Sequence, residues 1–170
     1  LINSAGLFAS DVAQKIDGLK KEFILKTFFA KGNYFSVGKD LGIRHLIYPI
    51  PEGFGLGIHL TLELDHSVKF GPDVEWVDEV DYSVDPKRAA DFYHAIRKYY
   101  PRLANDTLQP GYSGIRPKVA AKGSAAGDFL VQGPQEHSVP GLVNMYGIES
   151  PGLTSSLSLA NLVAEKLSLP

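Results

Sequence analysis

The pattern of apolar and polar residues changes its period along the chain, and its first stretch predicts a strand followed by a helix. Leu1 to Asn3 is a short apolar run that ends in small residues, which predicts a buried strand. After a tight turn, apolar residues recur at helical spacing as far as Gly18. The positions with helical spacing are Leu7, Val12, Ala13 and Ile16.

Between Phe23 and Val80 the period changes to two, which is typical of β-strands. The stretches TFFAKGNYFSV and HLIYPIP predict strands, and GLGIHLTLELDHSVKFGPD predicts a hairpin that turns at Asp65 to Ser67. Alternation gives the first strand of this hairpin two faces. The apolar face comprises Leu56, Ile58, Leu60, Leu62 and Leu64, and the polar face comprises His59, Thr61, Glu63 and Asp65. We therefore expect an antiparallel sheet with one polar face.

A second helix is predicted between Asp85 and Pro101, because an Asp before a Pro is typical of a helix start. Its apolar residues lie on one side, so the helix is expected to pack on the sheet. The stretches SGIRPKVA, DFLVQG and GLVNMYGI predict three short strands, and AAKGSAAGD predicts a surface loop. The apolar spacing from Leu153 to Leu167 predicts a closing helix.

Composition limits the classes of function. The 170 residues suffice for one sizeable domain, with 44% hydrophobic and 21% charged residues. A formal net charge of −2 without a basic run argues against binding to nucleic acid or anionic lipid, so small molecules or proteins are the expected partners. The absence of cysteine excludes disulfides and thiolate chemistry, and no apolar run approaches the roughly 20 residues of a membrane helix.

Arg116 stands out in the stretch QPGYSGIRPKVA. The following proline favours extended backbone at Arg116, and Gly114 leaves room for another group to approach. A guanidinium held in this way matches a carboxylate in a bidentate manner, which suits the capture of an organic acid. Two interpretations stay open at this point: a substrate-binding arginine, or a structural ion pair with a nearby Asp or Glu.

Two further sites have a functional and a structural interpretation. The stretch NMYGIESPGLTSS leads from a strand through a turn into a helix, whose N-terminus would attract an anion or would be an ordinary capped helix. His59 is a candidate base or hydrogen-bond donor, or a solvent-facing strand histidine. The glycines of GFGLGIHL do not form a dinucleotide fingerprint, and GYSGI is no nucleophile elbow. His59 and the Asp65-His66 pair lack a metal-ligand spacing, so no metal site is expected.

Several stretches together resemble one family across nearly the whole chain and in the family's order. They are NSAGLFASDVA, KGNYFSV, YPIP, GLGIHLTLELD, FGPDVEW, YSGIRPK and GLVNMYGIESPGLTSSLSLANLVA. The chain resembles the C-terminal half of FAD-dependent oxidoreductases of the D-amino-acid-oxidase superfamily, closest to the L-2-hydroxyglutarate dehydrogenase/oxidase branch. The resemblance implies an α+β fold, with an antiparallel or mixed substrate-binding sheet, flanking helices, and short strand and helix pieces of an incomplete FAD-binding domain.

The resemblance also assigns residues. GIRP matches the motif whose arginine binds the substrate carboxylate, which implies that role for Arg116, and His59 falls where the hydroxy-acid branch has an active-site histidine. Tyr112 and Thr61 are the other expected substrate-binding residues. Expected FAD contacts lie in the NSAG turn, in the GIRP region and in the loop before the last helix; they are Asn3, Ala5, Gly6, Gly114, Gly147, Ile148, Ser150, Pro151, Gly152, Leu153, Thr154 and Ser155.

The resemblance implies oxidation of a 2-hydroxy acid similar to 2-hydroxyglutarate, with Arg116 on the carboxylate, His59 taking the hydroxyl proton and FAD accepting the α-hydrogen. Two alternatives remain: an amine or amino-acid oxidase of the same superfamily, and a non-catalytic acid-binding or interaction domain. The electron acceptor is expected to be oxygen or a quinone. A cytoplasmic location is expected, with a peripheral position at the inner membrane as the alternative.

The expected domain organisation follows from the same resemblance. Residues 1–20 and 126–170 would belong to the FAD-binding domain, and residues 21–125 would form the substrate-binding domain. Because the chain starts without Met and after the family's G-x-G-x-x-G segment, we expect a fragment that binds FAD weakly or not at all and is inactive alone. Self-association through the surface left exposed by the missing domain is a further expectation.

Overall fold

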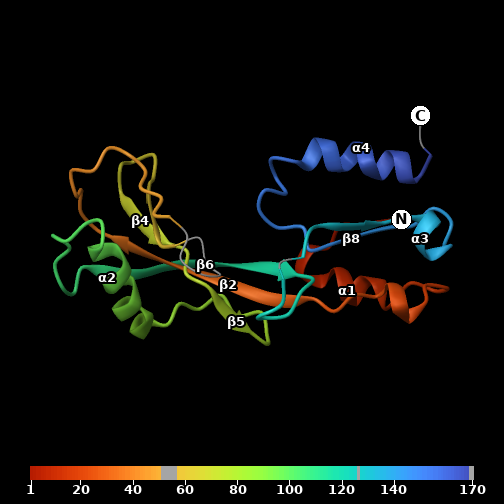
Figure 1. Cartoon of the computed structure of the whole chain (residues 1–170), viewed down its shortest axis with the longest axis horizontal. Coiled ribbons are helices and arrows are strands. Elements are labelled where there is room, and N and C mark those ends of the chain that lie inside the picture. Colours follow the sequence, from red (N-terminus) through yellow and green to blue (C-terminus); the bar gives the residue numbers. More distant parts are fainter. Residues whose placement is uncertain (51–56, 126, 169–170) are drawn as a thin grey trace. The chain divides into compact units, whose positions relative to one another are not determined.

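A computed structural model describes residues 1–50, 57–125 and 127–168, and these form two compact units (Figure 1). The first unit comprises residues 1–30 and 116–170, and the second comprises residues 31–115. Both boundaries fall inside long strands, β2 (Phe28–Val37) and β6 (Leu108–Lys118), which pair with each other. The sequence placed the boundaries after residues 20 and 125, and the roles assigned to the two parts stay predictions.

A three-stranded sheet lies at the centre of the first unit, in the order β1-β8-β7. β1 (Ile2–Asn3) runs parallel to β8 (Val143–Tyr146), and β7 (Leu130–Gln132) runs antiparallel to it. All four residues of β8 are buried, as expected of a central strand covered on both faces. The helical elements of this unit are η1 (Gly6–Phe8), α1 (Ala9–Ala13), η2 (Lys21–Phe23), α3 (Pro134–His137) and α4 (Ser156–Lys166).

Helices α1 and α4 cover opposite faces of β8, as Figure 1 shows. The alternation of side chains along the strand explains this arrangement. Tyr146 packs with the fully buried Ala9 and Ala13 of α1, whereas Val143 and Met145 pack with Val163 of α4. The small side chains of Ala9 and Ala13 let α1 approach the sheet closely.

The second unit contains a five-stranded sheet in the order β3-β4-β2-β5, and β6 pairs with β2. Its further strands are β3 (His59–Leu62), β4 (Val68–Gly71) and β5 (Glu75–Val77). β4 is antiparallel to both β2 and β3, which confirms the predicted hairpin and its antiparallel sheet. The turn lies where the sequence placed it: His66 has a φ of 67° and the Ser67 amide donates to Asp65 at 2.9 Å.

One face of this sheet is covered by α2 (Ala89–Arg97), which follows the single turn η3 (Pro86–Arg88). The Asp85 carboxylate accepts a 2.9 Å hydrogen bond from the Lys87 amide, so the predicted helix start is confirmed. Phe92 is fully buried and its ring centroid lies 4.6 Å from that of Phe35 on β2. The buried core around this pair comprises Phe35, Val37, Ile58, Leu60, Val68, Phe70, Phe92, Ile96, Leu103 and Leu108.

Several expectations differ from the structure. The first residues form the predicted strand, but they are not buried: Leu1 and Ile2 are 69% and 49% exposed, because β1 is an edge strand. In the HLIYPIP stretch, the described residues form only one bridge, from Ile47 to Leu60. Leu64 is fully exposed beyond the end of β3, and Leu56 lies outside the described residues. The predicted α+β class is nevertheless confirmed.

No helix in residues 1–50, 57–125 or 127–168 is long and apolar enough to cross a membrane.

Glu136 joins α3 to α4, and this contact gives a pH-dependent prediction. Its carboxylate accepts from the Gly133 amide at 2.6 Å and from Lys166 Nζ at 2.6 Å, and the hydrogen bond with Lys166 lowers the pKa of Glu136 below 4.5. A lowered folded-state pKa contributes stability above the unfolded pKa, and this contribution is lost as pH falls through the folded pKa. The side chain is 40% exposed, which keeps the effect small.

We expect Glu136→Gln to lower the free energy of unfolding by about 0.5–1 kcal/mol at neutral pH. The difference from the wild type should shrink as the pH falls through the lowered pKa of Glu136, because the wild-type carboxylate is then also neutral. Urea denaturation at neutral and acidic pH measures it. Glu165→Gln on the exposed side of α4 is the control, since Glu165 has no ion pair with a described residue, and it should show no such dependence.

Candidate functional site

The predicted FAD contacts at the start of the chain lie where β1 ends and α1 begins. Asn3 is 2% exposed, and its Nδ2 donates to Ala9 O at 2.8 Å and to Asn144 Oδ1 at 2.9 Å. Ala5 is exposed, and Gly6 starts η1 with a φ of 58°. This positive φ favours glycine, and the space beside Gly6 is open, because a Cβ there would meet nothing within 4 Å. Asn3 thus fixes a turn of small residues at the carboxyl end of a strand.

The second group of predicted FAD contacts is the turn between β8 and α4, residues 147–155. Gly147 has a φ of 68°, and a Cβ there would lie 2.9 Å from Val119 Cγ1. A Cβ at Gly152 would lie 2.6 Å from the Glu149 carbonyl oxygen, which accepts from the Gly152 amide. Ser155 Oγ donates to the Pro151 carbonyl at 3.1 Å. The glycines therefore permit a tight turn that side chains would block.

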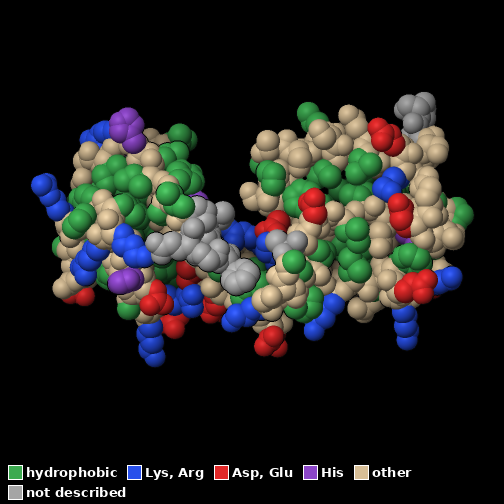
Figure 2. Space-filling model, viewed as in Figure 1, with side chains coloured by type: hydrophobic (Ala, Val, Ile, Leu, Met, Phe, Trp, Pro, Cys, Tyr) green, Lys and Arg blue, Asp and Glu red, His purple; other side chains and the backbone are tan. Residues whose placement is uncertain are grey.

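This turn also presents apolar and hydroxyl-bearing side chains at the surface. Leu153 and Leu157 are 91% and 82% exposed, and Ser150 and Thr154 are exposed beside them. Figure 2 shows apolar side chains on the visible surface in the region of α4. The turn at residues 3–6 and the turn at residues 147–155 thus combine small, apolar and hydroxyl-bearing residues.

Arg116 lies near the end of β6 and faces a carboxylate of its own unit. Its Nε is 3.7 Å from Glu149 Oε2, and Lys118 Nζ forms an ion pair with Glu149 Oε1. The side chains of Arg116 and Lys118 are 26% and 29% exposed, and that of Glu149 is 14% exposed. The structural ion pair left open by the sequence is therefore present. The contact given by this pair is at Nε, and neither Nη1 nor Nη2 of Arg116 makes a hydrogen bond with a described residue.

The other predicted substrate-side residues belong to the second unit. His59 and Thr61 alternate with core residues on β3, so both point to the face of the sheet opposite α2. The His59 ring centroid lies 4.1 Å from that of Tyr48, at an interplanar angle of 44°. Thr61 Oγ1 donates to the Lys69 carbonyl at 3.3 Å, and Gly114 is exposed on β6.

Tyr112 belongs to an aromatic and cationic cluster that sequence reasoning missed. It stacks on Tyr34 with centroids 4.6 Å apart, and Lys69 Nζ lies 4.7 Å from the Tyr112 centroid while pairing with Glu63. Burial alone would lower the pKa of Lys69, but hydrogen bonds with Glu63 and Tyr112 outweigh it and raise the pKa. The period-two pattern could have placed Lys69 on the polar face, since it lies between the core residues Val68 and Phe70.

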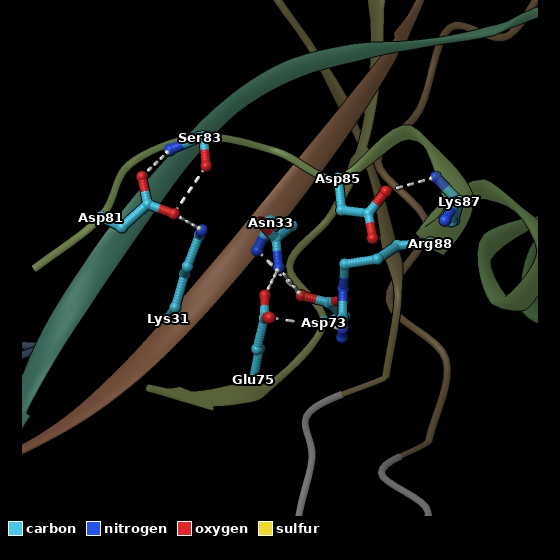
Figure 3. A network of polar contacts seen from close by, with 9 residues as sticks. All are labelled: Lys31, Asn33, Asp73, Glu75, Asp81, Ser83, Asp85, Lys87 and Arg88. Carbon is cyan, nitrogen blue, oxygen red and sulfur yellow. Dashed lines mark hydrogen bonds and ion pairs between the residues drawn. The ribbon is translucent and has the colours of Figure 1, made fainter. Parts of the chain in front are cut away.

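A second polar network in this unit, drawn in Figure 3, has a structural role. Arg88 Nε donates to Asp73 Oδ2 at 2.7 Å, and Asn33 Nδ2 donates to Asp73 and Glu75 at 3.0 and 2.9 Å. Lys31, with a side chain only 4% exposed, lies 3.5 Å from Asp81. These pairs tie β2 and β5 to the start of α2. No group of three or more metal-ligating side chains occurs in the described ranges.

The predicted site residues are thus divided between the units. Asn3, Ala5, Gly6, Arg116 and residues 147–155 belong to the first, and His59, Thr61, Tyr112 and Gly114 belong to the second. Within the first unit, the structure brings Arg116 next to Glu149 of the 147–155 turn. Within the second, it places Thr61 opposite Lys69, which contacts Tyr112.

The family model described as FAD dependent oxidoreductase matches residues 1–166, and the chain belongs to this family.

Two relatives with known names are similar to nearly the whole chain. The chain is 48% identical over 178 residues to the mitochondrial L-2-hydroxyglutarate dehydrogenase of Arabidopsis thaliana. The alignment covers 98% of this chain and 37% of that protein. It is 28% identical over 206 residues to the L-2-hydroxyglutarate dehydrogenase of Escherichia coli K12. This alignment covers 98% of the chain and 47% of that protein. The chain therefore spans less than half the length of these relatives.

The fold is shared with a solved flavoprotein. Dithionite-reduced L-alpha-glycerophosphate oxidase from Mycoplasma pneumoniae, with FAD bound, superposes with a TM-score of 0.78 at 19% identity. The match covers 99% of this chain and 42% of that protein. At this identity the likeness establishes the fold.

The first unit suits one part of FAD. A flavin has a flat ring with an apolar end and a polar end, and the exposed Leu153 and the hydroxyl of Thr154 offer both kinds of contact. The turn at Gly6 is open beside its Cα, so a cofactor could approach the backbone there. The exposed apolar and hydroxyl side chains and the open glycine turn therefore fit the cofactor of this family.

Proposed function

We propose that the whole protein containing this chain is an FAD-dependent dehydrogenase or oxidase that converts a 2-hydroxy acid, similar to 2-hydroxyglutarate, to the 2-oxo acid. The observation that carries the proposal is the 48% identity to the L-2-hydroxyglutarate dehydrogenase of Arabidopsis thaliana across 98% of the chain. FAD, when bound, supplies the two-electron chemistry that the side chains lack.

Arg116 is proposed to bind the carboxylate of the substrate. A guanidinium offers a planar pair of donors that matches the two carboxylate oxygens. The Nε of Arg116 faces Glu149, whereas its two terminal nitrogens make no hydrogen bond with a described residue, which supports a role in capturing a ligand. The neighbouring Lys118 adds positive charge and is itself paired with Glu149.

His59 is proposed to accept the proton of the substrate hydroxyl. A neutral imidazole nitrogen can accept this proton at physiological pH, and the contact with Tyr48 limits the orientations of the ring. Thr61 and Tyr112 are proposed to hydrogen-bond the substrate from the same polar sheet face. In this proposal Thr61 and Tyr112 bind the substrate, His59 takes the hydroxyl proton and Arg116 binds the carboxylate.

The two parts of the chain are proposed to have the roles that the sequence assigned. Residues 1–20 and 126–170 would hold FAD through the turn at Asn3, Ala5 and Gly6 and through the turn at residues 147–155. Residues 21–125 would supply the substrate-binding sheet, with Gly114 close to the cofactor. The two glycine turns of the first unit and the polar face of the second support this assignment.

The function is tested by flavin reduction with matched acids. The whole protein, loaded with FAD, is mixed without oxygen with L-2-hydroxyglutarate or with L-glutamate, and the flavin absorbance is followed. We expect bleaching by the hydroxy acid and none by the amino acid, because the proposed base serves a hydroxyl group. Bleaching by the amino acid alone would show an amino-acid oxidase.

A third outcome identifies a different class of protein. If neither acid bleaches the flavin, but calorimetry detects binding of 2-hydroxyglutarate, the protein is a non-catalytic acid-binding protein. His59→Asn is the matched variant for the catalytic case. It should lower kcat by about 10²-fold or more while leaving the KM within about threefold, since the base acts in the chemical step.

Three further properties are proposed as the resemblance implied them: the electron acceptor, self-association and the location. Oxygen or a quinone accepts the electrons, the chain alone self-associates through apolar surface, and the protein is cytoplasmic or peripheral to the inner membrane. The exposed Leu153 and Leu157 support the second of these proposals. Light scattering of the 170-residue chain tests it, and a monomer at all concentrations would reject it.

A further inference from the structure

Glu149 lies between two cations that project from the same strand. Arg116 and Lys118 are two residues apart on β6, so their side chains point to the same side. Glu149 contacts Arg116 Nε through Oε2, at 3.7 Å, and Lys118 Nζ through Oε1. Each oxygen of the carboxylate therefore faces a different cation.

The backbone around Glu149 fixes the direction of its carboxylate. The carbonyl of Glu149 accepts from the Gly152 amide, and a Cβ at Gly152 would lie 2.6 Å from that carbonyl oxygen. Gly147 packs against Val119 so closely that a Cβ would lie 2.9 Å from Val119 Cγ1. The turn therefore has little freedom, and the 14% exposed side chain of Glu149 has few alternative directions.

The geometry leaves part of the arginine available. Arg116 lies nearest to Glu149 at its Nε, and Nη1 and Nη2 make no hydrogen bond with a described residue. These two nitrogens form the end of the guanidinium that matches a carboxylate in a bidentate manner. Two cations against one carboxylate also leave one positive charge, which one carboxylate ligand would neutralise.

We propose that Glu149 is a positioning residue for Arg116: it holds the guanidinium at Nε and directs Nη1 and Nη2 toward the substrate carboxylate. Lys118 neutralises Glu149, so that this carboxylate does not compete with the substrate for Arg116. The inference rests on the proposed role of Arg116 and adds two residues to the recognition of the acid.

Glu149→Gln in the FAD-loaded whole protein separates positioning from simple electrostatics. The glutamine keeps the shape and removes the negative charge, so attraction of an anion by charge alone would strengthen binding. Loss of positioning would weaken it. We expect the Kd for 2-oxoglutarate, measured by titration calorimetry, to rise about tenfold, and the KM for L-2-hydroxyglutarate to rise similarly with kcat changed less than about twofold.

Two further variants define the mechanism. Lys118→Met leaves Glu149 charged but without its cation, so the carboxylate turns more fully to Arg116 and 2-oxoglutarate binds several-fold more weakly. In an Arg116→Ala background, Glu149→Gln should add less than about a twofold effect, because the two residues act as one unit. Glu136→Gln, another glutamate paired with a lysine in the same unit, is the control and should leave binding unchanged.

The results that overturn the inference are distinct from those that overturn the function. Unchanged or tighter binding of 2-oxoglutarate by Glu149→Gln, with weaker binding by Arg116→Ala, rejects positioning by Glu149 but keeps the role of Arg116. Unchanged binding by Arg116→Ala rejects both. If Glu149→Gln loses FAD, Lys118→Met decides the question, and unchanged binding by that variant rejects the inference.

Discussion

Arg116→Ala in the whole protein should raise the KM for L-2-hydroxyglutarate by about a hundredfold. Removal of a bidentate, charged hydrogen-bond partner costs about 3 kcal/mol, and each 1.4 kcal/mol corresponds to a factor of ten. Turnover should fall as well, since a substrate without its clamp is poorly oriented for reaction. Steady-state kinetics of the variant and the wild type measure both parameters.

Arg116→Lys is the matched variant for this prediction. Lysine keeps the positive charge but loses the planar pair of donors, so its KM should lie between those of the wild type and Arg116→Ala. If neither the KM nor the turnover of Arg116→Ala changes, the ion pair with Glu149 is only structural. In that case the variant should show a lower free energy of unfolding as its main effect.

Phe92→Ala should lower the free energy of unfolding of the second unit by about 3–5 kcal/mol. Phe92 is fully buried and its ring contacts Phe35 with centroids 4.6 Å apart, so truncation leaves a cavity between α2 and the sheet. Urea denaturation followed by the fluorescence of Trp76 measures the effect, because Trp76 is the only tryptophan of the sequence and lies in β5 of this unit.

Tyr82→Ala is the control for this core variant. Tyr82 is 54% exposed in the same unit, so its truncation should change the free energy of unfolding by less than about 0.5 kcal/mol. Equal effects of the two substitutions would contradict the assignment of Phe92 to the core. Phe92→Leu should fall between them, since leucine fills much of the space.

Elements with strong periodic patterns could be predicted from the sequence. The alternation around Leu60 gave β3 and its hairpin with β4, and Asp85 with Pro86 gave the start of η3 and α2. These features depend on local chemistry, namely side-chain alternation and the capping of free amides. The family and its cofactor followed from motifs that extend over most of the chain, and the match over residues 1–166 confirms them.

Features that depend on distant partners could not be predicted. The stretch around Ile47 has the composition of a strand, but in its described part it meets Leu60 at a single bridge. The run at Leu1 and Ile2 is exposed because, among the described strands, β1 is at the edge of its sheet beside β8. The helix α3 was missed for a different reason, since its four residues are too few to show a helical period. Its start signals are local: Pro134 at its first position, and Glu136, which accepts from the Gly133 amide.

The candidate site shows the same limit. The backbone around Arg116 indicated a fixed arginine, and the sequence allowed an ion pair with some Asp or Glu. It could not select Glu149, which lies in a different stretch and reaches Arg116 only in the folded turn. Lys69 and Tyr34 were missed because their contact with Tyr112 depends on how β2, β4 and β6 pair.

The interrupted first unit has a consequence for the order of folding during synthesis. The second unit is complete once residue 115 has left the ribosome, and domains generally fold as they emerge. β1, in contrast, must wait for its partner β8, since Ile2 pairs with Val143. The nascent chain would therefore carry a folded second unit before Ile2 can pair with Val143, so the sheet of the first unit closes last.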